Sequence, residues 1–447
     1  MRRLSPLLVD LYELTMAQAY LDHGPHEPAT FDLFVRTLPP ERGYLVAAGL
    51  GTLLDQLERF AFSADDLAHL AADGRFDDRL LTRLERLRFT GHVDAVPEGT
   101  PVFAEEPILR ITAPMVEAQL LETVVMNLVH VQTLFASKAA RIVGAARGRS
   151  VVDFGLRRAH GPDAGWMGAR AFWIAGLDGT SNVLAGRELG IPIAGTMAHA
   201  FVQAHEDEVA AFRAFAETWP ETILLVDTYD TLRGVDRVID LARELGDAFR
   251  VRGIRLDSGD LGELTREARR RLDAAGLEAV TIFASGNLDE HAIAELIERG
   301  APVDGFGVGT RMTTSQDDPN LDIVYKLAQV GDRPLLKLST GKATLPGIKQ
   351  VWRRRDDDGR LAGDVIGLAD EQLDGEPLLV PVMRAGRRLD AGREPLGDAR
   401  ERARRCLAEL PDGVRRIDPD REDYPVSVSE RLDELRRRIT ERLEGSG

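Results

Sequence analysis

The sequence has little of what marks secreted and membrane proteins. It contains one cysteine, Cys406, among 447 residues, which excludes a disulfide framework within the chain and a zinc site built from several cysteines. A lone cysteine is typical of the reducing cytoplasm, where we expect the protein to be located. Asp10 and Glu13 interrupt the apolar run near the N-terminus, so that run lacks the pattern of a signal peptide. No run of about 18 apolar residues occurs, and we expect no membrane partner.

The chain also has fewer basic residues than acidic ones. The chain has 57 Lys and Arg against 73 Asp and Glu, which gives a formal net charge of -16. Such an acidic chain is a poor ligand for nucleic acids, so we expect no nucleic-acid partner. An anionic substrate would need a local cluster of cations, and four arginines lie within or beside the motifs described below: Arg157, Arg158, Arg255 and Arg311.

Two common nucleotide-binding motifs are missing. The Walker motif GxxxxGK[ST] does not occur, and GxGxxG does not occur in the strand–helix context that a dinucleotide fold needs. Internal repeats and low-complexity linkers are absent as well. What is present is a chain of globular composition, 44% hydrophobic and 29% charged, whose length predicts two or three domains.

The apolar pattern predicts mixed α and β structure at both ends of the chain. We expect one helix over 4–22, two or three helices over 51–89, a long apolar helix over 116–145, and strands over 29–38 and within 91–114. After residue 320 the pattern is again that of β-strands, and the tail 395–447 is charged and helical. We expect the N- and C-terminal regions to pack together.

Between these ends, apolar strands alternate with helices. Strand candidates lie at 150–154, 191–195, 223–227, 252–256, 280–284 and 303–308. Helical patterns fill the gaps at 166–189, 200–219, 231–246, 260–275 and 288–299. This alternation predicts parallel strands joined by right-handed crossovers. About six such units favour a closed or nearly closed α/β barrel, with an open sheet as the alternative.

Seven short segments rich in Gly, Asp, Ser and Thr lie between residues 153 and 310, each at a place where a buried strand meets a loop. They read DFGLRRAHGP, GTSNVLAG, GTMAHAF, VDTYDT, RLDSGDL, ASGNLDE and DGFGVGT. Loops at the carboxyl ends of parallel strands meet at one edge of the sheet, where α/β enzymes assemble phosphate sites. We therefore expect these loops to converge on a single site.

His199 and Asp227 are the first candidates for chemistry. His199, in GTMAHAF, can act as a base, a metal ligand or a nucleophile, or it can be a structural residue at a helix start. The spacing HAFVQAHE is not that of a zincin, and a helix would direct His199 and His205 to different faces. Asp227, at the end of ILLVD, can orient an imidazole by accepting its ring N–H, or it can be a turn or cap residue.

RLDSGDL and the glycine-bearing loops supply the remaining candidates. Arg255 and Asp257 have the same parity on a strand, so both can face one sheet edge, although a structural ion pair is the alternative. Arg255 can hold a carboxylate or phosphate, and Asp257 can bind Mg²⁺ or a ribose hydroxyl. The glycines of 284–287 and 306–310 let backbone N–H groups approach a phosphate, or they form simple tight turns. Phe154 is followed by two arginines, a combination that suits a flat anionic ring, or it is a core aromatic residue followed by surface arginines.

Taken together, these segments resemble the nicotinate phosphoribosyltransferases, a family of NAD-salvage enzymes. The similarity runs in the family's order from VDLYELTMAQAY near the N-terminus to KATLPGIKQVWR near residue 353. The most specific pieces are DLYELTM, FGLRRAHGPD, GTSNV, GTMAHAF, RLDSGDL and TLPGIK.

The resemblance implies the type II phosphoribosyltransferase fold, an irregular parallel α/β barrel flanked by an α+β domain from the N- and C-terminal parts. We expect an N-terminal α+β domain at 1–120, the barrel catalytic domain at 121–350, and a C-terminal segment at 351–447 that packs on the N-terminal domain. The implied reaction joins nicotinate to 5-phosphoribosyl 1-pyrophosphate and gives nicotinate mononucleotide and pyrophosphate. It implies Mg²⁺, coupling to ATP hydrolysis through a phosphohistidine, and a homodimer with shared active sites.

The same resemblance assigns roles to residues of this chain. His199 corresponds to the phosphorylated histidine, Asp227 to the carboxylate behind it, and Asp257 to the residue near the ribose and Mg²⁺. Tyr12 corresponds to a tyrosine that reaches into the neighbouring subunit's site. The other predicted substrate-binding residues are Phe154, Arg157, Ser181, Thr196 and Arg255. The predicted phosphate-binding residues are Ser258, Gly286, Gly307, Gly309 and Thr310. The ligands of the metal stay unassigned.

The segment GTSN bears on the choice between nicotinate and nicotinamide. Related nicotinamide enzymes carry an aspartate where this chain has Ser181. An aspartate would repel a carboxylate, whereas a serine can donate a hydrogen bond to it, so the sequence favours the acid. Val9 departs from the family pattern, which has a threonine before Asp10.

The sequence also leaves three alternative functions. The nearest are phosphoribosyltransferases for nicotinamide or quinolinate, of which the quinolinate enzymes are shorter and lack the histidine segment. A catalytically inactive paralogue is disfavoured because the predicted catalytic residues are intact. A barrel aldolase would need a Schiff-base lysine at a strand end, and none of the six strand candidates supplies one.

Overall fold

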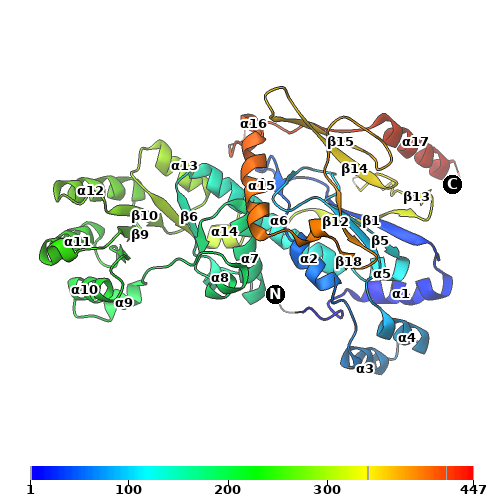
Figure 1. Ribbon diagram of the computed structural model, residues 1–447, viewed down its shortest axis with the longest axis horizontal. Coiled ribbons are helices and arrows are strands. Elements are labelled where there is room, and N and C mark those ends of the chain that lie inside the picture. Colours follow the sequence, from blue (N-terminus) through cyan, green and yellow to red (C-terminus); the bar gives the residue numbers. More distant parts are fainter. Residues whose placement is uncertain (1–2, 340–341, 419, 446–447) are drawn as a thin grey trace. The chain divides into compact units, whose positions relative to one another are not determined.

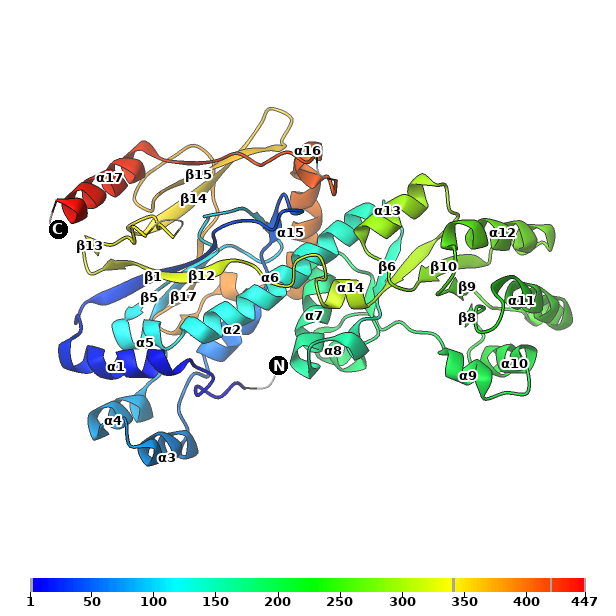
Figure 2. The same cartoon turned by 180° about the vertical axis from the view of Figure 1, so that it is seen from behind.

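The computed structural model describes residues 3–339, 342–418 and 420–445. The chain forms two compact units, which Figures 1 and 2 show from opposite sides. The first unit comprises Met1–Ser137 and Asp318–Gly447, and the second unit is Lys138–Asp317. The units change over at residues 137 and 317, whereas the sequence placed boundaries at 120 and 350. The outermost residues of the predicted segments 1–120 and 351–447 lie outside the described residues.

The first unit is built on a seven-stranded sheet in the order β13-β12-β1-β5-β3-β17-β18. These strands are β13 (Arg333–Pro334), β12 (Ile323–Val330), β1 (Pro28–Val35), β5 (Leu109–Pro114), β3 (His92–Ala95), β17 (Val380–Arg384) and β18 (Arg387–Arg388). β12 pairs with β1, and β17 pairs with β3. Segments on both sides of the second unit therefore share one sheet, which confirms that the N- and C-terminal parts build one α+β body.

Two smaller sheets and a set of helices complete the first unit. The four-stranded sheet holds β16 (Glu376–Pro377), β14 (Lys349–Arg355), β15 (Leu361–Leu368) and β19 (Val426–Val428), and β2 (Leu45–Val46) pairs with β4 (Pro101–Val102). The helices that begin here are α1 (Leu11–His23), α2 (Leu50–Leu57), α3 (Ala64–Asp73), α4 (Asp78–Arg86), α5 (Met115–Gln119), α6 (Glu122–Ala145), η3 (Asp390–Arg393), α15 (Leu396–Glu409), α16 (Asp412–Arg415) and α17 (Glu430–Glu444). None of the helices in the described ranges is long and apolar enough to cross a membrane.

The first helix is shorter than the sequence predicts. The expected helix over 4–22 begins at Leu11, because the chain from Ser5 to Leu8 forms a turn in which the Leu8 N–H donates to the Ser5 carbonyl at 3.0 Å. Asp10 has the extended conformation of an N-cap residue. The proline at position 6 disfavours a helical conformation at Ser5, and the extended backbone at Asp10 delays the helix start to Leu11.

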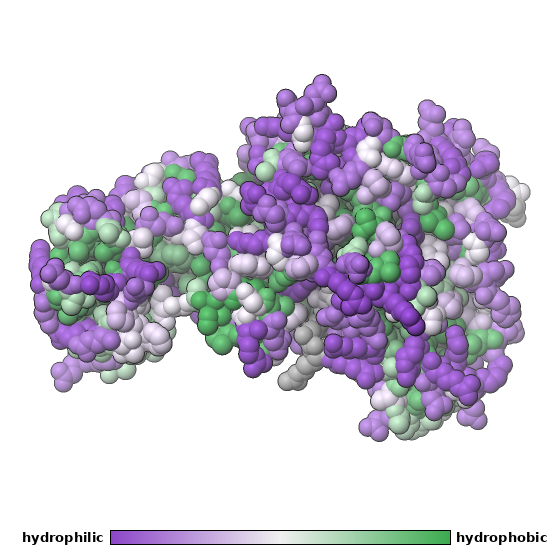
Figure 3. Space-filling model, viewed as in Figure 1, coloured by the Kyte–Doolittle hydropathy of each residue, from purple (hydrophilic) through white to green (hydrophobic). Residues whose placement is uncertain are grey.

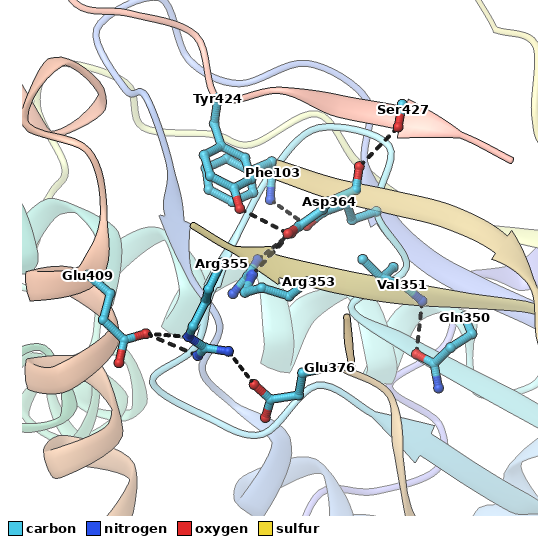
Figure 4. Close-up of polar contacts among 11 residues, drawn as sticks. Phe103, Gln350, Val351, Arg353, Arg355, Asp364, Glu376, Glu409, Tyr424 and Ser427 are labelled. Carbon is cyan, nitrogen blue, oxygen red and sulfur yellow. Dashed lines mark hydrogen bonds and ion pairs between the residues drawn. The ribbon is translucent and has the colours of Figure 1, made fainter. Parts of the chain in front are cut away.

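A buried polar cluster fastens the four-stranded sheet of the first unit (Figure 4). Arg353 of β14 and Asp364 of β15 form an ion pair of 2.5 Å, with side chains 2% and 0% exposed. The Tyr424 hydroxyl donates to Asp364 at 3.0 Å, and the Tyr424 ring stacks on Phe103 with centroids 3.8 Å apart. The cluster therefore joins two paired strands to the chain segments that lead into β19 and out of β4.

The second unit is a six-stranded sheet in which every pairing is parallel, in the order β7-β6-β11-β10-β9-β8. The strands are β6 (Ser150–Asp153), β7 (Gly179–Thr180), β8 (Ile223–Leu225), β9 (Gly253–Leu256), β10 (Thr281–Ser285) and β11 (Gly305–Val308). The predicted α/β barrel is confirmed as a curled, partly closed sheet with β7 and β8 at its edges. Residues 191–195 do not form the expected strand. Ile193 makes only an isolated bridge to Thr180, and β7 takes that place.

Helices fill the connections between these strands, and one short helix, α14 (Thr310–Thr313), follows the last strand, β11. They are η1 (Leu156–Arg158), α7 (Pro162–Ala175), α8 (Val183–Leu189), α9 (His199–Gln203), α10 (Glu208–Thr218), α11 (Thr231–Leu245), η2 (Gly246–Ala248), α12 (Leu261–Ala274), α13 (Glu290–Glu298) and α14 (Thr310–Thr313). Two predicted helices are each broken in two. The one over 166–189 stops at Gly176, whose φ of +114° ends α7. The one over 200–219 is interrupted before Asp207, which caps α10 by accepting from the Ala210 N–H at 2.8 Å.

The core of the second unit explains why its strands appear in the sequence as apolar runs. Phe212 of α10 packs in one cluster with Leu224 of β8, Ile254 of β9 and Ile282 of β10, all 0% exposed. Parallel strands covered by helices are buried on both faces, so their side chains do not alternate in polarity. The polar segments that follow these strands lie at one edge of the sheet, because parallel strands place all their carboxyl ends on the same side.

Candidate active site

The carboxyl edge of the second unit's sheet brings the predicted site loops together. The GTMAH segment, which precedes α9, is joined to this edge by a hydrogen bond of 3.0 Å from Arg255 Nη2 to the Met197 carbonyl. His199, at the start of α9, shares a hydrogen bond of 3.1 Å between its Nδ1 and the hydroxyl of Thr228, which follows β8. Hydrogen bonds therefore join the segment that carries His199 to Arg255 of β9 and to the loop that follows β8.

The contact behind His199 differs from the expected one. The sequence placed the Asp227 carboxylate against the ring, but the hydroxyl of the next residue, Thr228, makes the contact. Asp227 Oδ2 accepts instead from the Asp257 backbone N–H at 2.9 Å and from the Ser258 hydroxyl at 2.6 Å. Asp227 thus links the end of β8 to the loop after β9, and Thr228 is a site residue that the sequence reasoning missed. The segment VDTYDT contains both Asp227 and Thr228, and their order in the sequence does not determine which side chain faces the His199 imidazole.

Asp257 is fixed from two sides. Its Oδ1 accepts from the Ser285 hydroxyl at 2.6 Å, so the ends of β9 and β10 are joined by side chains as well as by the sheet. Behind it, Gly286 has φ +93°, and a Cβ at that position would lie 1.9 Å from the Asp257 carbonyl oxygen. Only glycine allows this close approach with this backbone conformation. The sequence did not predict Ser285 as a site residue. Its position beside Gly286 at the end of β10 was the signal that could have indicated it.

Arg255 and Phe154 form a flat cationic surface. The Arg255 guanidinium carbon lies 5.7 Å from the centroid of the Phe154 ring, within cation–π range. Burial lowers the pKa of Arg255, and the neighbouring Arg157 charge lowers it further, while Asp257 and Asp227 oppose the shift. Arginine stays protonated in proteins, so the site keeps its positive charge. The Arg255 Nε is buried and has no hydrogen-bond partner in the described residues, which leaves a donor for a ligand.

Gly307 makes space for the Phe154 ring. A Cβ at Gly307 would lie 2.5 Å from two ring carbons of Phe154, and one at Gly305 would lie 2.5 Å from the Phe283 ring. The two rings have centroids 6.3 Å apart. The glycine that the sequence assigned to phosphate binding therefore also decides where the aromatic ring can sit.

Asp153 organises the β6 end and was not predicted as a site residue. It is 2% exposed, and its carboxylate accepts from the Thr180 hydroxyl and the Gly155 N–H, both at 2.7 Å. Its backbone carbonyl accepts from the Ser181 N–H at 2.8 Å. Burial raises the pKa of Asp153, and its two hydrogen bonds oppose this. Ser181, the predicted specificity residue, is thereby held beside the Phe154 segment.

The other predicted residues lie on η1, at the start of α14, before α9 and on α1. Gly309 precedes α14, which begins at Thr310, and the Thr313 N–H donates to the Gly309 carbonyl at 3.0 Å. Arg157 lies on η1, and the Thr196 hydroxyl donates to the Met197 carbonyl at 3.4 Å. Tyr12 belongs to α1 of the first unit and is 45% exposed.

The carboxylates of the site fit a weakly held Mg²⁺. Among the described residues no group of three His, Cys, Asp or Glu side chains is arranged to hold a metal ion. Mg²⁺ commonly uses only one or two protein carboxylates, together with water and substrate phosphates. Asp227 Oδ1 is buried without a partner within the described part of the chain, and Asp257 is its neighbour, so these two carboxylates meet that requirement.

Comparisons with known proteins agree with this geometry. The family model for the nicotinate phosphoribosyltransferase N-terminal domain matches residues 7–130, and the nicotinate phosphoribosyltransferase family model matches residues 149–345. A nicotinate phosphoribosyltransferase of Mycobacterium tuberculosis is 53% identical over 426 residues, covering 95% of this chain and 92% of that protein. One from Bacillus subtilis is 44% identical over 382 residues, covering 83% and 78%.

A solved structure extends the similarity to the whole fold. The crystal structure of human nicotinic acid phosphoribosyltransferase matches with a TM-score of 0.86 and 31% identity, covering 96% of this chain and 99% of that chain. The sequence matches, the superposition and the connected site at the sheet edge all lead to one conclusion. The chain belongs to the nicotinate phosphoribosyltransferase family.

Proposed function

We propose that this protein joins nicotinate to 5-phosphoribosyl 1-pyrophosphate in NAD salvage. The pyridine nitrogen forms a bond to C1 of the ribose, the bond from C1 to the pyrophosphate oxygen breaks, and pyrophosphate leaves. The observation that carries the proposal is the Arg255–Phe154 pair, linked at one sheet edge to His199, Asp227 and Asp257.

The Arg255–Phe154 pair supplies the nicotinate pocket. The Phe154 ring offers a face on which the pyridine can stack, and Arg255 offers a charge for the carboxylate. Burial of Arg255 strengthens its attraction for an anion, because water screens it less. Ser181 adds a donor that suits a carboxylate, where an aspartate would suit an amide.

A single substitution tests this specificity. Ser181→Asp should raise the KM for nicotinate, because it places a negative charge beside the substrate carboxylate, and should raise relative activity with nicotinamide. Ser181→Ala is the matched control, because it removes the hydroxyl without adding charge. Steady-state rates with both substrates measure the effect. Equal losses of nicotinate activity in the two variants would contradict the electrostatic argument.

The reaction depends on stabilising the leaving pyrophosphate and the cationic ribose. Mg²⁺, held by Asp257 and Asp227 together with the substrate, would supply positive charge to the pyrophosphate when bound. The carboxylate of Asp257, fixed by Ser285, places negative charge near the electron-poor C1 of the ribose. The glycines after β10 and β11 leave room for the 5′-phosphate at the backbone.

His199 is the residue we assign to ATP coupling. It would accept the γ-phosphoryl group of ATP on a ring nitrogen, with ADP as the leaving group. Thr228 already engages Nδ1, so Nε2 is the nitrogen we assign to the transfer. The phosphohistidine adds negative charge at the pyrophosphate site and orders it, and its hydrolysis draws the equilibrium toward the nucleotide.

The coupling is tested with a variant that cannot be phosphorylated. His199→Ala should abolish ATP-stimulated turnover and incorporation of phosphate from γ-labelled ATP, but should leave a slow ATP-independent rate. Thr228→Val is the companion variant, because it keeps the imidazole and removes only its hydrogen-bond partner, so labelling should persist at a lower rate. Equal loss of the ATP-stimulated and ATP-independent rates in His199→Ala would count against the coupling role.

Two further assignments, the homodimer and the role of Tyr12 at a neighbouring subunit's site, rest on the resemblance together with exposed apolar surface. Tyr12 is exposed on α1 and available to a neighbouring subunit. On α8, Val183 and Leu184 are 66% and 49% exposed, and Figure 3 shows a hydrophobic patch over α7 and α8. Exposed apolar patches mark protein–protein contacts, which supports a homodimer. The cytoplasmic location rests on the single cysteine.

A further inference from the structure

A buried network of charges lies beneath the glycine loops of the second unit. Lys138 of α6 is 2% exposed, and its Nζ lies 2.7 Å from Glu290 Oε2 and 2.9 Å from Asp317 Oδ1. Arg141, one helical turn further on, donates from Nε to Glu290 Oε1 at 2.8 Å. The two cations and two carboxylates balance one another, and none is more than 9% exposed.

The carboxylates of this network belong to the elements that follow the two predicted phosphate loops. Glu290 is the first residue of α13, four residues after Gly286. Asp317 follows α14, whose first residue is Thr310; the end of β11 and the turn into α14 are here called the Gly307–Thr310 loop. Lys138 therefore bridges the bases of both loops with one ammonium group. Asp289 and Arg311, which pair at 2.5 Å, form a second link between the same two elements.

The energetics favour a role beyond folding. Removing an ammonium group from water costs several kcal/mol, and apolar residues of similar volume commonly stabilise a core as well or better. A buried charge needs a partner of opposite charge, and removing that partner is strongly destabilising. What an ion pair adds over apolar packing is a fixed direction and spacing between the groups it joins.

We propose that Lys138 is a positioning residue that sets the spacing between the Gly286 loop and the Gly307–Thr310 loop, and so the fit of the 5′-phosphate of phosphoribosyl pyrophosphate. The inference rests on the proposed function, because the ligand of these loops comes from it. Lys138 acts through Glu290 and Asp317 and does not touch the substrate.

The test separates positioning from stability with three variants. Lys138→Met removes the bridge, and we expect the KM for phosphoribosyl pyrophosphate to rise about tenfold or more, with the KM for nicotinate and kcat within about threefold of wild type. Lys138→Met/Glu290→Gln also removes one uncompensated carboxylate, so it should recover thermal stability and keep the raised KM. Arg237→Met breaks a different pair in the same unit, with the buried Glu208, and should lower stability without changing either KM.

Kinetics and binding each give a result that would overturn the role of Lys138. A KM for phosphoribosyl pyrophosphate within twofold of wild type in the double variant would overturn the proposal, as would an equal rise in Arg237→Met. Equilibrium binding of ribose 5-phosphate, measured by calorimetry, separates this inference from the proposed function. If the wild type binds ribose 5-phosphate but does not turn over nicotinate, weaker binding by the double variant still supports the role of Lys138. Unchanged binding, or none by the wild type, overturns it.

Discussion

Gly286→Ala is the substitution for which the structure gives the sharpest expectation. The backbone at Gly286 has φ +93°, and a Cβ there would lie 1.9 Å from the Asp257 carbonyl oxygen and 2.9 Å from its carbon. An alanine at positive φ costs about 1–2 kcal/mol, and overpacking against a backbone carbonyl adds about 1–3 kcal/mol. The loop after β9 must therefore shift, and it carries the hydrogen bond from Asp257 to Asp227.

The matched control for this variant is Gly276→Ala. Gly276 has φ +75° in the same unit, but a Cβ there meets nothing within 4 Å. Urea unfolding should show a loss of about 1–2 kcal/mol for the control and about 2–5 kcal/mol for Gly286→Ala. In kinetics only Gly286→Ala should raise the KM for phosphoribosyl pyrophosphate and lower kcat. Indistinguishable stability and kinetics in the two variants would refute the role given to the close approach.

Three other outcomes follow from the contacts described. Gly307→Ala should raise the KM for nicotinate by about 5- to 100-fold, because its Cβ meets the Phe154 ring; a larger effect on phosphoribosyl pyrophosphate would contradict this. Burial raises the pKa of Glu13 to about 7, so its contribution to stability is full below pH 4.5 and is lost as pH rises through 7. The free energy of unfolding of Glu13→Gln, measured with urea, should therefore rise relative to that of wild type by roughly 1–3 kcal/mol as the pH increases from 5 to 8. A difference between the two proteins that does not change with pH would exclude the raised pKa. Arg353→Met leaves Asp364 buried without its partner, so calorimetry should show a loss of about 3–5 kcal/mol with both KM values unchanged, and a loss below about 1 kcal/mol would refute this.

The sequence predicted the arrangement of the second unit because its strands carry a strong signal. Five apolar runs between residues 150 and 308 became parallel strands, and the polar segments after them met at one edge. Parallel strands buried on both faces leave long apolar runs, and their topology forces the following loops together. The sequence could therefore predict which loops lie at the carboxyl edge of the sheet, and these loops carry the candidate site residues.

The details that the sequence did not predict depend on single residues and on contacts across the chain. Gly176 and Asp207 each interrupt a continuous helical pattern, because a positive φ and an N-cap outweigh helix periodicity. The choice of Thr228 over Asp227 as the partner of His199 depends on side-chain direction within the β8–α11 loop, which residue order does not encode. The pairing of β12 with β1 joins segments almost 300 residues apart in the sequence, beyond the reach of local pattern.

The most direct test of the central claim is an assay of the purified chain with nicotinate, phosphoribosyl pyrophosphate and Mg²⁺, with and without ATP. The site geometry predicts nicotinate mononucleotide and pyrophosphate in equal amounts, a rate that ATP increases, and a strong preference for nicotinate over nicotinamide. No mononucleotide under either condition, or equal turnover of the acid and the amide, would contradict the account.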